Sequence, residues 1–293
     1  MADVAVGIPG LDWAKGGLVA RWRAALGGGL ILAIVGGAAV MAPVLAPYGA
    51  EVADPSAILV APDAKHLFGT DTNGMDVLSR VMWGGRLDLS IALIAACVSF
   101  GVGSVVGGAI GYAGTRGRLV RLCGSAALRV LEVVQAFPVF VLALALVGVA
   151  GRSTTNLTLV LSVVQIPLFI RLSRSAVLTT SVGEFLEASR CAGASERAMF
   201  FRHILPNSLS SSVAMISPVA GSSLLLAAGL SFVGAGVPAP TPEWGYMVSV
   251  GAPNLYTGQW WPALIPGATI GLTILGFALV GRSIEAFMDP ARR

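Results

Sequence analysis

Charged residues are scarce in this sequence of 293 residues, at 12% of the chain. A soluble globular domain carries about 25%, and hydrophobic residues here reach 55%. The shortage of charge therefore excludes an ordinary soluble fold, and the hydrophobic content excludes disorder for most of the chain. Together they indicate an integral membrane protein.

Lysine, histidine and cysteine are rarer still. The only lysines, Lys15 and Lys65, each follow alanine, so the phosphate-binding loop G-x-x-x-x-G-K-[ST] is absent. The two histidines and three cysteines are too scattered for a metal site or a disulfide framework. We therefore expect no cofactor, metal or catalytic residue in this chain. The net charge of +4 is attributed to basic residues that flank membrane spans, not to nucleic-acid binding.

Six apolar runs approach the ~20 residues that a helix needs to cross a bilayer. They predict an all-α integral membrane protein with spans at roughly 27–46, 88–112, 128–150, 156–175, 209–233 and 262–286. The first run is too long for the apolar core of a signal peptide, so an uncleaved span is favoured. Pro138 and Pro167 are expected to kink or break the third and fourth spans.

Lysine and arginine also predict the orientation. If the N-terminus is cytoplasmic, all but four of the 19 basic residues fall on the cytoplasmic side. The resulting division is a cytoplasmic segment 1–26, a first span 27–46, an extracytoplasmic loop 47–87 with a short interfacial helix, a core membrane domain 88–286 and a cytoplasmic tail 287–293. Within the core, the loop at about 176–207 is cytoplasmic. The four exceptions are Lys65, Arg80, Arg86 and Arg152.

Small and polar residues mark particular faces of the predicted spans. Gly103, Gly107 and Gly111 recur every four residues in the second span, a spacing that lets another helix approach closely. Polar groups at membrane depth could line a wet pathway or could hydrogen-bond a neighbouring helix. These candidate pathway residues are Gln135, Gln165, Ser217 and Ser222.

Ionisable groups are almost absent from the centres of the spans. This scarcity disfavours a secondary carrier without excluding it, because backbone carbonyls can bind Na⁺. Serines crowd the fifth span, but neither His66 nor His203 falls in a span, so an intramembrane serine hydrolase lacks its base. The sequence is that of a pore or scaffold without its own energy source.

The stretch EFLEASRCAGASERAMFFRHILPN, residues 184–207, gathers charge in an otherwise apolar chain. It predicts a helix over 184–192, a turn at Gly193 and a second helix whose first turn is capped by Ser195. Composition leaves two interpretations, a solvated connector or a docking element for a cytoplasmic partner. The residues expected to share one face of the second helix are Ala194, Ala198, Phe201 and Leu205.

Within this stretch, Glu187-Ala188-Ser189, Gly193 and Leu205-Pro206 have the spacing of the E-A-A loop of ABC importer permeases. Ser189 replaces an alanine of that pattern. RHILPN at 202–207 is similar to the dipeptide/oligopeptide/nickel branch, as is HLFGTDTNGMDVLSRVMWGGR at 66–86, which has Met75 in place of an arginine. The resemblance spans roughly residues 20–293. Shorter matches to the same branch are, in chain order, QAFP at 135–138, LSFVG at 230–234, PEWG at 242–245 and MDP at 288–290.

The resemblance implies the six-helix fold of type I ABC importer permeases and a role in importing peptides. Nickel or glutathione are the alternative substrates, and a stand-alone channel or secondary carrier is the alternative class. The implied partners are a homologous second permease, cytoplasmic ATPases that carry ATP and Mg²⁺, and an extracytoplasmic binding protein, all at a bacterial inner membrane. The implied ATPase-coupling residues are Glu184, Glu187, Ala188, Ser189, Gly193, Ala194, Leu205 and Pro206.

Overall fold

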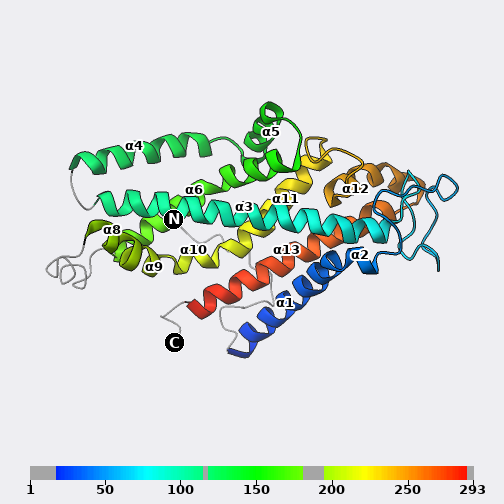
Figure 1. Cartoon of the computed structure of the whole chain (residues 1–293), viewed down its shortest axis with the longest axis horizontal. Coiled ribbons are helices and arrows are strands. Elements are labelled where there is room, and N and C mark those ends of the chain that lie inside the picture. The colour runs from blue at the N-terminus through cyan, green and yellow to red at the C-terminus, as the bar shows by residue number, and fades with distance from the viewer. Residues whose placement is uncertain (1–17, 115–117, 181–194, 289–293) are drawn as a thin grey trace.

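The computed structural model describes residues 18–114, 118–180 and 195–288, and the regular secondary structure of this part of the chain is helical, with two isolated β-bridges in its loops. The long helices run along the long axis of the molecule (Figure 1). They are α1 (Leu18–Val40), α3 (Val77–Gly114), α6 (Thr154–Thr180), α11 (Ile216–Phe232) and α13 (Trp261–Met288). The others are α2 (Ala42–Leu45), α4 (Arg118–Gln135), α5 (Val139–Ala150), α8 (Glu196–Ala198), the π-helix η1 (Met199–Ile204), α9 (Leu205–Ser208), α10 (Ser210–Ala214), α12 (Trp244–Gly251) and the 3₁₀ helix η2 (Ala252–Thr257).

Five helical segments of the described chain are long and apolar enough to cross a membrane, and α4 with α5 makes a sixth if the bent pair is one span. Each predicted span corresponds to one of these segments. The predicted class, an all-α membrane protein, is confirmed.

The second span starts earlier than its apolar run. Helix α3 begins at Val77, whereas the prediction placed a separate interfacial helix before residue 88. That expected helix is instead the first part of α3, which runs unbroken for 38 residues. The Asp76 carboxylate accepts hydrogen bonds from the amide (2.8 Å) and hydroxyl (2.7 Å) of Ser79, and these bonds cap the start of the helix. The apolar run does not extend to this start of α3, because the first part of the helix includes the charged residues Arg80 and Arg86.

The third span is broken. Helices α4 and α5 meet at 91° across residues 136–138. Pro138 has no N–H to donate and disfavours a helical conformation at the residue before it, so the helix stops there. Pro167, by contrast, lies inside the continuous helix α6. Pro138 thus breaks its span and Pro167 does not. The apolar runs that contain the two prolines did not distinguish these outcomes.

The glycine stripe of α3 packs directly on the backbone of α6. A Cβ atom at Gly107 would lie 2.2 Å from the Ile170 carbonyl oxygen, and one at Gly111 would lie 3.0 Å from that of Arg174. At Gly103 the nearest atom would be Phe169 Cβ at 2.5 Å. The predicted close approach of another helix is confirmed.

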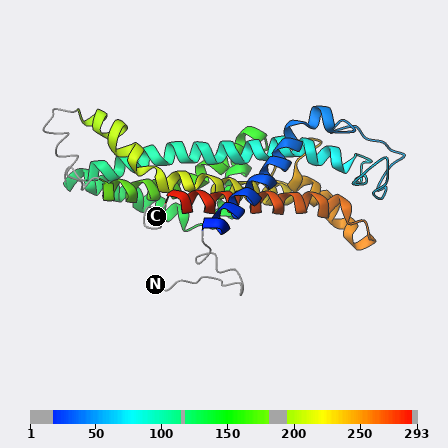
Figure 2. The same ribbon diagram turned by 90° about the horizontal axis from the view of Figure 1, so that it is seen from below.

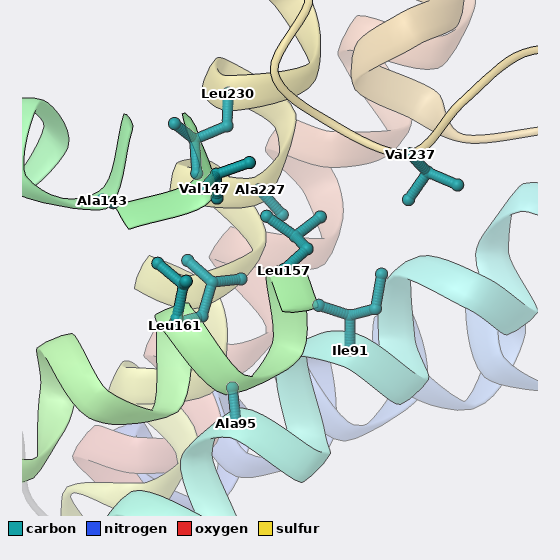
Figure 3. Close-up of a cluster of buried hydrophobic side chains, with 10 residues drawn as sticks. Ile91, Ala95, Ala143, Val147, Leu157, Leu161, Ala227, Leu230 and Val237 are labelled. Atoms are coloured by element: carbon teal, nitrogen blue, oxygen red, sulfur yellow. The ribbon is translucent and has the colours of Figure 1, made fainter. Parts of the chain in front are cut away.

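Helices α3, α5, α6 and α11 enclose a common apolar core (Figure 3). Leu157 and Leu161 of α6 lie in this cluster with Ile91 of α3, Val147 of α5 and Leu230 of α11. This core holds the second half of the broken span, α5, against the bundle.

Helix α1 lies at the edge of the bundle and crosses it obliquely (Figure 2). Its main partner is α13, to which Gly28 comes so close that a Cβ atom would lie 2.7 Å from Leu279 Cβ. The rings of Trp22 and Phe287 meet edge to face at 5.0 Å. The first residues of α1 and the last of α13 therefore lie at the same end of the molecule.

A buried polar network organises residues 46–76 at the opposite end. His66 Nδ1 lies 3.0 Å from Asp76 Oδ1, and Arg80 Nε lies 3.6 Å from Asp71 Oδ2. Met75, which stands where the resembled pattern has arginine, packs against Arg80, with its sulfur 2.6 Å from Nη1. Sequence reasoning left His66 without a role. The structure shows that it joins the loop to the start of α3.

Two buried carboxyl groups fasten α12 to α3. Asp88 of α3 accepts a 2.9 Å hydrogen bond from the Trp244 amide. Glu243 caps α12 by accepting from the amides of Gly245 (2.9 Å) and Tyr246 (2.6 Å). Each of the two acidic residues is 1% exposed, and their side chains contact one another. No sequence pattern indicates this contact, because the two residues lie far apart in the chain.

Candidate functional site

The predicted coupling segment is described from Ser195 onward. Ser195 Oγ accepts a 3.4 Å hydrogen bond from the Ala198 amide and caps α8, as predicted. Leu205 is buried, and Pro206 is exposed in the first turn of α9. The remaining predicted coupling residues lie outside the described residues: Glu184, Glu187, Ala188, Ser189, Gly193 and Ala194.

The prediction that Ala198, Phe201 and Leu205 share one face of this segment is wrong. Ala198 and Phe201 are exposed, Phe201 by 57%, whereas Leu205 is buried. The cause is the π-helical turn of η1, whose i→i+5 hydrogen bonds shift the buried face away from an α-helical period. The residues that do pack inward are Met199, Phe200, Ile204 and Leu205.

The inward face ties the segment to the ends of two spans. Phe200 stacks on Tyr112 near the end of α3, with ring centroids 5.8 Å apart. The Tyr112 hydroxyl donates a hydrogen bond to the Glu196 carboxylate, and Val177 of α6 completes the cluster. Packed side chains therefore connect residues 195–208 to α3 and α6.

A groove of about 830 Å³ opens where the third span is broken. Residues 134–139 and the facing side of α6 form it, with apolar side chains over most of the lining. Phe137, Val139 and Val163 line it and are exposed, so the groove opens on the surface of this chain. Its polar lining comes from Gln135, Gln165 and Arg171.

Two of the four candidate pathway residues, Gln135 and Gln165, line this groove, and each has a polar partner. Gln135 accepts a hydrogen bond from Arg171 Nη1, and Gln165 donates a 2.7 Å hydrogen bond to Ser222 Oγ of α11. Ser217 is separate: it is buried and donates a 2.6 Å hydrogen bond to the Phe277 carbonyl of α13. Ser217 thus has the helix-packing bond that was the alternative to a pathway role. Sequence reasoning assigned Arg171 to no site, although a charge within a predicted span was a signal.

Thiol accessibility separates these positions. In a chain with the three native cysteines changed to serine, Gln165→Cys should react with a charged, membrane-impermeant thiol reagent at least roughly tenfold faster than Ser217→Cys. The groove opens on the surface of this chain, whereas Ser217 is buried against α13. Labelling rates of the purified protein measure this difference, and Leu161→Cys, fully buried in the core, gives the unreactive reference. Equal rates at 165 and 217 would remove the distinction.

The comparisons with known proteins agree with this architecture. Residues 103–293 match the family described as binding-protein-dependent transport system inner membrane component. The chain is 35% identical over 252 residues to the dipeptide transport system permease protein of Alkalihalophilus pseudofirmus, covering 86% of this chain and 81% of that protein.

Other relatives are named for different substrates. The chain is 35% identical over 251 residues to the probable D,D-dipeptide transport system permease protein of Escherichia coli, covering 86% of this chain and 82% of the relative. It is 33% identical over 272 residues to the glutathione transport system permease protein of Pectobacterium atrosepticum, covering 92% and 88%. The resemblance read from the E-A-A spacing is confirmed. The chain belongs to the binding-protein-dependent transport system inner membrane components, the permease subunits of type I ABC importers.

Proposed function

We propose that this permease forms half of the translocation pathway for small peptides in an ATP-driven importer. The observation that carries the proposal is the groove at the α4–α5 break, which joins a largely apolar lining to a few polar groups and is open on one side. A homologous second permease would close that side. Dipeptide and D,D-dipeptide relatives support peptides as the substrate class. Glutathione, itself a peptide, is the second candidate because one relative is named for it.

The proposed importer takes its energy from other chains. The absent phosphate-binding loop supports ATP and Mg²⁺ being held by separate cytoplasmic ATPase subunits. An extracytoplasmic binding protein would deliver the peptide. The bias of basic residues supports placing α8 and α9, together with both chain termini, on the cytoplasmic side of the inner membrane and residues 46–76 on the other.

The segment 184–206 would couple the ATPases to the spans. In this proposal Glu187 makes a polar contact in a cleft of the ATPase, and Gly193 provides the bend between two short helices. ATP closes the ATPase pair, and the motion reaches α3 and α6 through the contacts of Phe200 and Tyr112. Both sites then bias one two-state element, the inward- or outward-open arrangement of the spans, as allosteric coupling requires.

Reconstitution tests the function. The permease pair with its ATPases and binding protein should take up a labelled dipeptide into proteoliposomes only when ATP is supplied. This chain alone should take up none. Uptake by this chain alone, without ATP, would instead establish a channel or a secondary carrier.

Two substitutions test the coupling role. Glu187→Lys and Gly193→Asp should each lower ATP-dependent uptake and ATPase co-purification by roughly tenfold or more, because each places a wrong charge in a docking contact. Membrane insertion should persist. The matched control is Glu285→Lys, the same charge reversal at an exposed position of α13, which should leave both measurements unchanged. Normal uptake in both loop variants would leave the segment a simple connector.

A further inference from the structure

The groove contains one cation, Arg171, in the second half of the membrane-spanning helix α6. It lies 17 residues after the start of α6 at Thr154 and contributes the only charged side chain among the described residues that line the groove. Ionisable residues inside membrane spans are costly, and they mark substrate or ion paths. The Arg171 side chain is exposed, so it is accessible to a ligand in the groove.

The described part of the chain supplies no counter-charge. No carboxylate oxygen of these residues lies within 4.0 Å of the Arg171 nitrogens. Its hydrogen bond is to the neutral amide oxygen of Gln135, through Nη1. A guanidinium has five donors in a planar fork that matches a carboxylate in a bidentate way. The guanidinium retains donors for an anion in the groove.

The break in the third span adds to the attraction for an anion. Helix α5 begins at Val139, on the groove wall, and no side chain caps it. Its first N–H groups have no partner within the helix, and its dipole places partial positive charge at this end. Broken membrane helices whose N-termini face a binding site stabilise anionic substrate groups in this way. The arginine and the helix end lie on the same groove.

The size and lining of the groove suit a small organic ligand. Ligand pockets of about 300–1,000 Å³ are mostly apolar and contain a few polar groups that fix orientation. This groove has about 830 Å³ and the polar groups of Gln135, Gln165 and Arg171. Its apolar surface can accept varied side chains without selecting among them.

We propose that this groove binds the C-terminal carboxylate of a peptide in transit, with Arg171 as its ligand. The proposal rests on the proposed function. A carboxylate would replace the Gln135 oxygen at Arg171, a charged acceptor in place of a neutral one. The carboxylate is the group that dipeptides, D,D-dipeptides and glutathione share, whereas their side chains and handedness differ. The pathway would thus recognise the C-terminal carboxylate, which all such substrates have. Selection among the substrates would be left to the binding protein.

The test compares peptide acids with peptide amides in the reconstituted importer, containing both permeases, the ATPases and the binding protein. The probes are labelled dialanine and glutathione, and the same two compounds with a C-terminal carboxamide. Arg171→Gln should lower uptake of the acids by roughly tenfold or more, the range for a hydrogen bond to a charged group. Uptake of the amides should stay as in wild type. Because every sample contains the same binding protein, a change in the acid-to-amide ratio belongs to the permease.

Two further variants make the result specific. Arg174→Gln removes a cation one turn along α6 that does not line the groove, and it should leave the ratio unchanged. Gln135→Glu keeps Arg171 but gives it a carboxylate of its own, so it should also lower uptake of the acids alone. Gln135→Glu tests the proposal even if Arg171→Gln fails to assemble, as judged by ATPase activity stimulated by the binding protein.

The outcomes separate the two proposals. The carboxylate site is overturned if Arg171→Gln keeps the wild-type ratio of acid to amide uptake. If only Gln135→Glu assembles, the same result in that variant overturns it. In either case ATP-dependent uptake still supports peptide import. If the wild-type importer takes up none of the peptides with ATP, peptide import fails and the carboxylate site fails with it. A selective loss of acid uptake in both variants supports the site.

Discussion

Replacing Gly107 by alanine is expected to destabilise the permease by about 3 kcal/mol, at the upper end of the usual effect of overpacking. The added Cβ atom would lie 2.2 Å from the Ile170 carbonyl oxygen and 2.6 Å from its Cα. These are backbone atoms of α6, which cannot rotate away as the end of a side chain can. Helices α3 and α6 must separate along their shared length. The midpoint of thermal unfolding of the detergent-solubilised protein measures the loss.

Gly101→Ala is the matched control. It makes the same substitution in the same helix, but a Cβ atom there meets nothing within 4 Å. The control should leave the unfolding midpoint unchanged or raise it slightly, because alanine favours helix over glycine. Equal midpoints for the two variants would show that α3 and α6 do not pack as closely as the structure has them.

Glu243→Ala is expected to have a similarly large effect at the other end of the molecule. The substitution leaves the amides of Gly245 and Tyr246 without their acceptor, and a buried donor without a partner costs about 1–3 kcal/mol. These two hydrogen bonds are the cap of α12, and the substitution also removes the group in contact with Asp88. We expect a loss of roughly 3–5 kcal/mol, measured by thermal unfolding in detergent. Glu51→Ala, at an exposed acidic position of the same side, is the control and should change little.

Glu243 also gives stability a dependence on pH. Burial raises the pKa of the Glu243 carboxyl above its ordinary value of 4.5, against the opposing effect of the Tyr246 and Gly245 amides. The folded protein therefore holds this proton at pH values where the unfolded chain has released it. Stability from this group is fully present below pH 4.5 and falls as pH rises through the higher pKa of the folded state. Glu243→Gln, which cannot ionise, should flatten this fall in the unfolding midpoint, whereas an unchanged slope would assign it to other groups.

Local sequence signals predicted the features that depend on neighbours along the chain. The spans follow from apolar runs, and the close packing of α3 on α6 follows from glycines spaced four apart at 103, 107 and 111. The Ser195 cap follows from a residue type suited to a helix start. In each case a few adjacent residues contain the physical cause, so the sequence alone was sufficient.

Features made by distant residues were not predictable in this way. Trp244 and Asp88 are 156 positions apart, and Arg171 and Gln135 are 36 apart, so no periodicity relates them. The buried face of 196–205 was missed because a π-helical turn has a different period. The presence of Pro138 predicted a kink or break. The 91° angle between α4 and α5 depends on how α5 packs into the core shown in Figure 3.

Helix α3 is longer than the membrane is thick, and this has a mechanical consequence. At 1.5 Å per residue its 38 residues extend for about 57 Å, whereas the hydrocarbon of a bilayer is about 30 Å thick. At one end Asp76 ties the helix start to His66, and Asp88 ties it to Trp244 of α12. At the other end Tyr112 is hydrogen-bonded to Glu196 of α8. A rod of this length that tilts by about one degree about one end displaces the other by about 1 Å. A small tilt of α3 would therefore move the segments attached at both of its ends.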